Sequence, residues 1–172
     1  MPQITLFFFK KKYSGLGDKI NLITTCWSPG KLKGIEFYMY LDQNLDFTKY
    51  NYTYIGAIPK GYSFKNIKKY DPMWKKELGE NLRNHDIFIS GVQKDCASNC
   101  ISEALTCGLP VLYYNDGGSP EIVKEGGMGF NNIEEIIPNL ESLVKNYDSY
   151  IKNTRVPTIE DISQEYINFF SS

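Results

Sequence analysis

The residues most able to do chemistry lie between positions 95 and 123. Glu103 stands in the first turns of a helical segment that is otherwise largely apolar, and Asp95 precedes it by eight positions. A carboxylate placed in this way can accept hydrogen bonds from two neighbouring hydroxyl groups of a sugar, one on each oxygen. The spacing alone leaves a second interpretation open, in which Glu103 is an ordinary exposed residue of the helix.

The start of that helix is a second candidate feature. The helix is expected to begin near Ser98 or Asn99, so the amides of Asn99, Cys100 and Ile101 would be free to bind an anion such as phosphate. Asn99 and Glu103 are four positions apart and therefore share one helix face. The segment predicts an anion site beside a carboxylate.

A glycine-rich turn follows the next predicted strand, in the sequence NDGGSPE. Gly117 and Gly118 permit a positive φ angle and a close approach of backbone. Ser119 is expected to cap a short helix that has Pro120 at its first position. A tight turn between a strand and a helix, without a ligand, explains the same residues.

Two lysines, Lys31 and Lys33, follow the first predicted strand in the sequence CWSPGKLKG. A lysine at this place could neutralise a diphosphate, and surface charge is the alternative. In a doubly wound sheet, ligands bind at the carboxyl ends of the strands. Because the lysines, the helix start and the glycine turn all follow strands, together they predict one ligand site at that edge.

The elements that must position these residues are indicated by alternating apolar runs and amphipathic segments. Strands are predicted at 20–26, 51–58, 85–92 and 110–114, with a weaker one at 63–70. Helices are predicted at 33–45, 73–84, 98–107, 131–147 and 158–172. The alternation predicts an α/β fold: a single Rossmann-like, doubly wound domain with a mostly parallel sheet of about six strands flanked by helices.

Bulk composition narrows the class of protein. The chain has 172 residues, which suits one domain, and its formal charge of -1 does not favour nucleic acid as a partner. Its four cysteines form no Cys-x-x-Cys pair and its only histidine is His85, so no metal is expected and a reduced, cytoplasmic setting fits. The apolar run at 4–9 is too short to span a membrane.

The two ends of the chain carry apolar segments of their own. Residues 1–19 are expected to hold a strand or an interlobe segment, and residues 155–172 a C-terminal helix, within one domain over 1–172. That helix has Thr158 as its expected N-cap and an apolar stripe that includes Ile159, Ile162 and Tyr166. Such a stripe needs a surface to cover it.

The segment from Asp95 to Val111 resembles the acidic-x7-Glu segment of retaining glycosyltransferases of the two-lobed GT-B architecture, of the family 4 or group 1 type. The sequence NDGGSPEIV resembles the Gly-Gly-x-Pro-Glu stretch that follows it in those enzymes, and ITTCWSPGKLKG resembles the strand and Lys-Gly turn that open their donor lobe. The resemblance covers roughly residues 20–145 in consistent order.

The resemblance implies a site for a nucleotide diphosphate sugar, with no metal or other cofactor. The family's ribose-binding glutamate falls on Glu103, its donor-sugar acid on Asp95, and its diphosphate-binding lysine on Lys33. Base contacts fall near Tyr70 and Asp71. The arginine that usually partners the lysine is not found, because CWSPG stands in that region.

The resemblance also implies that this chain is one half of an active site. Only 19 residues precede the first predicted donor-lobe strand, whereas GT-B enzymes bind the acceptor with an N-terminal lobe. Either the chain is an excised or naturally separate donor lobe, or the other lobe comes from a partner chain. The apolar stripe near the C-terminus would then be self-buried or form a homodimer. A non-catalytic nucleotide-binding module acting with a partner is the main alternative, and a flavodoxin-like interaction domain without nucleotide affinity is a third.

Overall fold

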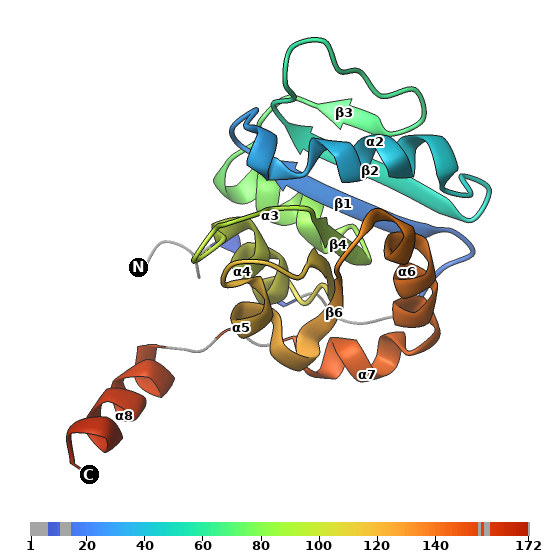
Figure 1. Ribbon diagram of the computed structural model, residues 1–172. Helices are drawn as coiled ribbons and strands as arrows, with labels where there is room; N and C mark the ends of the chain where they lie inside the picture. Colours follow the sequence, from blue (N-terminus) through green and yellow to red (C-terminus); the bar gives the residue numbers. More distant parts are fainter. Residues whose placement is uncertain (1–6, 11–14, 155, 157–158, 172) are drawn as a thin grey trace.

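The computed structural model describes residues 7–10, 15–154, 156 and 159–171 (Figure 1). At its centre is a six-stranded sheet in the order β3-β2-β1-β4-β5-β6, and the neighbouring strands pair in parallel. The strands are β1 (Ile20–Cys26), β2 (Tyr50–Gly56), β3 (Lys68–Tyr70), β4 (Ile87–Ser90), β5 (Val111–Tyr114) and β6 (Gly127–Phe130). The doubly wound parallel sheet predicted from the sequence is confirmed.

Helices cover both faces of this sheet (Figure 1). They are α2 (Ile35–Asn44), α3 (Lys75–Arg83), α4 (Asn99–Thr106), α5 (Ser119–Val123), α6 (Ile136–Lys145), α7 (Tyr147–Lys152) and α8 (Ile159–Phe170), with short 3-10 turns η1 (Lys31–Lys33), η2 (Lys124–Gly126) and η3 (Ile133–Glu135). The α2, α6 and α7 helices pack on one face, and α3 and α4 pack on the other.

The side-chain alternation of β1 shows how the two faces are filled. Leu22 packs in the apolar cluster that includes α2, and Ile23 packs in the cluster that includes α3 and α4. On α4, Ile101 and Leu105 are fully buried, and each such side chain contributes about 1.5 to 3 kcal/mol relative to exposure. Burial of this face fixes the position of α4, and therefore of its N-terminus, against β4.

Three details differ from the sequence-based expectation. The sixth strand, β6, was not located from the sequence, because its residues GMGF contain two glycines and no β-branched side chain. The helix predicted at 131–147 is divided into η3, α6 and α7, with a break at Asn146. Residues 7–10 of the described N-terminal segment form no strand, and the buried ring of Phe8 packs between α3 and α4.

The C-terminal helix α8 lies apart from the sheet and its flanking helices in Figure 1. Its Tyr166, Phe169 and Phe170 are exposed, so the predicted burial of this stripe within the chain does not hold for them. The predicted cap Thr158 and the side chains of Ile159 and Ile162 lie outside the described residues. None of the helices in the described ranges has the length and apolar character that crossing a bilayer requires.

Candidate functional site

A pocket of about 230 Å³ opens at the carboxyl edge of the sheet, between the loops that follow β1 and β4. Its lining residues are Thr25, Cys26, Trp27, Ser28, Lys33, Val92, Asp95, Ala97, Ser98, Asn99 and Cys100. Four residues predicted from the sequence, Lys33, Asp95, Asn99 and Cys100, are therefore brought together. The parallel strands explain this, because their carboxyl ends meet at one edge.

The two loops are tied to each other by backbone contacts. The amide of Gln93 donates to the carbonyl oxygen of Leu32 at 2.8 Å. Gly34 has φ 79° and packs so closely on Gly91 that a side chain at position 34 would overlap the Gly91 carbonyl. Glycine is therefore required after Lys33, and the close approach fixes where the lysine leaves the backbone.

Lys33 and Asp95 form an ion pair across the pocket. Lys33 Nζ lies 3.2 Å from Asp95 Oδ2, and the side chains keep 33% and 27% of their surface exposed. Asp95 Oδ1 also accepts a hydrogen bond from the amide of Ala97, at 3.2 Å. An incoming phosphate would therefore compete with Asp95 for the ammonium group of Lys33.

The glycine turn packs against another loop of the same chain, the one that holds Asp95. Gly117 has φ 58°, and a side chain there would overlap the backbone of Asp95. The amide of Gly118 donates to the carbonyl oxygen of Asp95 at 2.9 Å. The close approach that these glycines permit thus supports the loop that holds Asp95.

The predicted capping role of Ser119 is wrong. The N-cap of α5 is Gly118, because the amide of Ile122 donates to the carbonyl oxygen of Gly118 and so starts the helix one residue earlier. Ser119 is the first helical residue and is 1% exposed, and no side-chain hydrogen bond caps the helix. Its hydroxyl is therefore placed in the interior.

Glu103 is partly buried on α4, one turn beyond the pocket-lining residues. Its Oε2 atom is buried and has no hydrogen-bond partner among the described residues. Burial raises the pKa of Glu103 from 4.5 to about 7. The interpretation of Glu103 as an ordinary exposed helix residue does not fit these surroundings.

Cys100 connects Glu103 to the pocket electrostatically. Burial raises the pKa of its thiol to about 11, and the charge of Glu103 adds to this effect while that of Lys33 opposes it. All three side chains therefore belong to one electrostatic environment. Cys100 itself stays a neutral thiol at physiological pH.

Several pocket residues were not identified from the sequence. Thr25 is 6% exposed, and its Oγ1 makes no hydrogen bond of standard geometry in the described part of the chain, although its hydroxyl acts on the Cys100 thiol and lowers the pKa of that thiol. Trp27 lines the pocket and packs on Trp74, with ring centroids 4.9 Å apart. Two tryptophans placed in loops that follow strands were the signal that could have located this pair.

Tyr70, by contrast, is not among the residues that line this pocket. It ends β3, and its ring is 46% exposed. Asp71, the next residue, pairs with Lys69 at 3.0 Å. The predicted base contacts at this segment stay a prediction.

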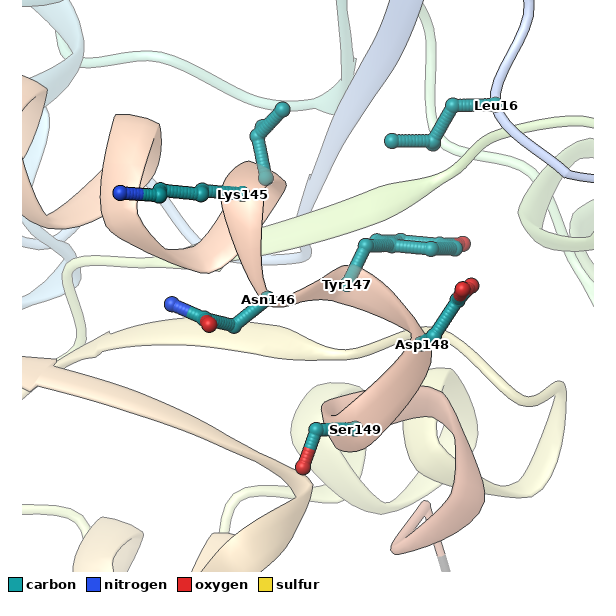
Figure 2. A pocket seen from close by; sticks show the side chains of 7 residues that line it. Leu16, Lys145, Asn146, Tyr147, Asp148 and Ser149 are labelled. Carbon is teal, nitrogen blue, oxygen red and sulfur yellow. The ribbon is translucent and has the colours of Figure 1, made fainter.

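A second pocket, of about 300 Å³, lies where α6 meets α7 (Figure 2). It is lined by Leu16 and by residues 144–149. Leu16 precedes β1, and the Tyr147 hydroxyl donates to the carbonyl oxygen of Asp86 just before β4. This pocket is therefore at the amino edge of the sheet, opposite the predicted site residues.

The structure resembles solved glycosyltransferases. It matches sucrose-phosphate synthase from Thermosynechococcus elongatus with a TM-score of 0.68 and 14% identity, over 91% of this chain and 47% of that one. It matches the C-terminal domain of a group 1 family glycosyl transferase (LpcC) from Francisella tularensis with a TM-score of 0.68 and 16% identity, over 94% and 97%.

A third structure, of the Anabaena protein HepE in complex with UDP-glucose, matches with a TM-score of 0.64 and 14% identity, over 80% of this chain and 42% of that one. The chain thus spans about half the length of two of these three proteins and nearly all of the third. Comparison with curated proteins gives no match. At these identities the structures establish the fold, which is one lobe of the GT-B architecture.

Sequence comparison with protein families is more direct. Residues 64–162 match the family described as glycosyl transferases group 1. The matched segment includes α4, Asp95, Glu103 and the glycine turn, which are the features that resembled this family at the sequence level. The chain belongs to the group 1 glycosyl transferase family.

Proposed function

We propose that this chain is the donor-binding lobe of a glycosyltransferase that uses a nucleotide diphosphate sugar. The observation that carries the proposal is the buried, unpartnered Oε2 atom of Glu103 beside the pocket at the start of α4. A buried acceptor without a partner is costly, so its retention favours a ligand that supplies the missing donor.

Vicinal hydroxyl groups supply such donors. Two hydroxyls of a ribose can donate to the two carboxylate oxygens of Glu103, as the family resemblance implies. Ionisation of the carboxyl, which burial opposes in the free protein, would then be stabilised by the ligand. The ribose would therefore restore hydrogen bonding that the protein alone lacks.

The diphosphate would be held by Lys33 and by the first amides of α4. Those amides, at Asn99, Cys100 and Ile101, belong to the helical turn that leaves backbone N–H groups free, and the helix dipole favours an anion there. Lys33 is in the same pocket. In this proposal the lysine and the helix start offset part of the phosphate charge, and no metal ion is assigned to the site.

Asp95 is the proposed contact for the transferred sugar. Its carboxylate pairs with Lys33 in the free protein, and release of Lys33 to a phosphate would free Asp95 for sugar hydroxyls. The backbone of Gly117 and Gly118 supports the Asp95 loop. The acceptor and the rest of the chemistry are assigned to a second lobe, supplied by further sequence or by a partner chain, in a cytoplasmic setting.

Calorimetric titration of UDP and GDP tests the nucleotide site. A hydrogen bond to a charged group is worth about 1.5 to 3 kcal/mol, so Glu103→Ala should weaken nucleotide binding by roughly one to two decades. Glu141→Ala is the matched control, because Glu141 is exposed on α6. Equal affinities of wild type and Glu103→Ala would contradict the assigned role of Glu103, and no binding by wild type would contradict the proposed function.

A non-catalytic nucleotide-binding module is the second candidate. Two observations favour it: the sequence CWSPG stands in the region where the resemblance implies an arginine, and the lysine of the pocket is paired with Asp95. The test is donor turnover by this chain mixed with candidate N-terminal lobes. Sugar transfer in any such mixture would exclude this candidate, and donor binding without transfer or hydrolysis would support it.

A further inference from the structure

Trp27 and Trp74 form an exposed aromatic pair at the carboxyl edge of the sheet. Their ring centroids are 4.9 Å apart at an interplanar angle of 49°. The two side chains are 40% and 60% exposed. Tryptophan is enriched at binding interfaces, because its ring is largely apolar while its indole N–H can donate a hydrogen bond.

The backbone beside this pair is held in an unfavourable conformation. Lys75, the residue after Trp74, has φ 51°, and Lys94, the residue before Asp95, has φ 52°. Non-glycine residues rarely adopt such angles, and they persist where the surrounding structure imposes them, often at ligand sites. Of the three non-glycine residues with positive φ in the described chain, two thus flank residues at this edge.

The pair is continuous with the pocket proposed to hold the diphosphate. Trp27 lines that pocket together with Lys33 and Asn99, and Trp74, from the loop between β3 and α3, packs on Trp27. The sugar-facing side, with Asp95, lies in the loop after β4. Trp27 and Asp95 therefore reach the same pocket from two different loops.

We propose that the Trp27–Trp74 pair is the stacking platform for the base of the bound nucleotide. This inference rests on the proposed function, because it takes the diphosphate to be held by Lys33 and the start of α4. Stacking on an indole uses the π face that every base has, so the platform accepts pyrimidine and purine alike. Base recognition is thereby assigned to a pair of rings that includes a residue of the β1 loop, in place of Tyr70.

Intrinsic fluorescence gives a direct readout, because Trp27 and Trp74 are the two tryptophans of the chain. Tryptophan emission therefore reports on the proposed platform alone. The probes are UDP, GDP, inorganic pyrophosphate and glucose 1-phosphate. UDP and GDP should quench the emission in a saturable way, while pyrophosphate should compete for binding without the same quenching.

Substitution measures the contribution of each ring. Stacking of one base is worth about 1 to 3 kcal/mol, so Trp74→Ala should weaken binding of UDP and GDP by about tenfold or more, with pyrophosphate affinity unchanged. Trp74→Phe should retain most of the affinity. Tyr166→Ala is the matched control, because Tyr166 is 63% exposed on α8. Trp27→Ala is measured in parallel. If Trp27→Ala does not fold, the affinity of Trp74→Ala for UDP and GDP tests the platform by itself.

The outcomes separate this inference from the proposed function. If calorimetry shows that UDP binds but Trp74→Ala binds it equally well, the platform is wrong and the nucleotide site stands. Quenching by glucose 1-phosphate but not by UDP would overturn the platform in favour of a sugar, and a preference between UDP and GDP above about a hundredfold would overturn recognition by stacking alone. If wild type binds neither nucleotide, the proposed function fails and the platform fails with it.

Discussion

Asp42 on α2 and Glu103 on α4 are carboxylates on opposite faces of the same sheet, and their surroundings differ. The buried Asp42 accepts hydrogen bonds from the amides of Lys65, Asn66 and Ile67, at 2.8, 2.8 and 2.7 Å. Glu103 has a buried oxygen atom without any such partner in the described residues. The satisfied carboxylate organises a loop, and the unsatisfied one is available to a ligand.

Two adjacent threonines of β1 repeat this difference. Thr24 Oγ1 lies 2.8 Å from the Tyr52 hydroxyl and donates to the carbonyl oxygen of Ile89 at 2.6 Å. Thr25 points to the opposite face because side chains alternate along a strand, and its Oγ1 makes no hydrogen bond of standard geometry in the described chain, although it interacts with the Cys100 thiol. The α2 face is thus fully hydrogen-bonded at this position, while the α4 face is not.

The largest expected effect is at Asp42. Asp42→Ala removes three hydrogen bonds to a charged acceptor and leaves the amides of the 65–67 loop unpaired, which should lower the free energy of unfolding by roughly 3 to 4 kcal/mol. Urea denaturation of Asp42→Ala and wild type measures this difference in the free energy of unfolding. Glu36→Ala is the control, because Glu36 is exposed on the same helix. A loss at Asp42 no larger than that at Glu36 would remove the distinction between the two carboxylates.

The next largest effect is the pH dependence of stability at Glu103. Its pKa is raised by burial from 4.5 to about 7, so the folded state holds its proton more tightly. The resulting stabilisation is fully present below pH 4.5 and is lost as pH rises through about 7. Glu103→Gln should therefore be more stable than wild type by roughly 2 to 3 kcal/mol at about pH 8, with little difference at about pH 4.

Thermal or chemical denaturation across this pH range checks the prediction. The same substitution at the exposed Glu141 is the control and should leave the pH profile unchanged. A Glu103→Gln profile parallel to that of wild type would mean that Glu103 is solvated in solution.

Nucleotide affinity should rise with pH, whereas the free energy of unfolding falls over the same range. If ribose hydroxyls bind the ionised carboxylate, the competent fraction of Glu103 rises from about a tenth at about pH 6 to about nine tenths at about pH 8. UDP affinity should then rise about tenfold over this range. UDP affinity of Glu103→Gln is measured over the same pH range, because the titration of UDP itself affects wild type and variant alike. A difference between the two affinity profiles is then due to Glu103. Identical profiles would contradict its role.

The smallest expected effect separates the two threonines. Thr24→Val breaks two buried hydrogen bonds and should cost about 1 to 2 kcal/mol of unfolding free energy. Thr25→Val replaces a hydroxyl that interacts only with the weakly hydrogen-bonding Cys100 thiol by a methyl group of similar size, and should change the free energy of unfolding by less than about 1 kcal/mol. Parallel denaturation curves check both, and equal costs would show that Thr25 is hydrogen-bonded in solution.

Local patterns were sufficient for much of the fold and for part of the site. Apolar runs located β1 and β5, and the helix expected to begin near Ser98 or Asn99 begins at Asn99. β6 was missed because Gly127 and Gly129 give it little strand propensity, and its pairing with β5 supplies what the local sequence lacks. The cap of α5 was misplaced by one residue, because the amide of Ile122 donates to the carbonyl oxygen of Gly118 and the helix therefore starts earlier than the Ser-Pro pair indicates.

The sequence by itself determined the order of the first five strands and the helices between them, the buried side of α4 and the resemblance to the family, because periodicity and motif spacing are properties of neighbouring residues. Only the tertiary structure decided that Lys33 pairs with Asp95, that Trp27 packs on Trp74 and that Glu103 is desolvated. Each of these depends on distances between segments that are remote along the chain, and on how much water the packed helices exclude.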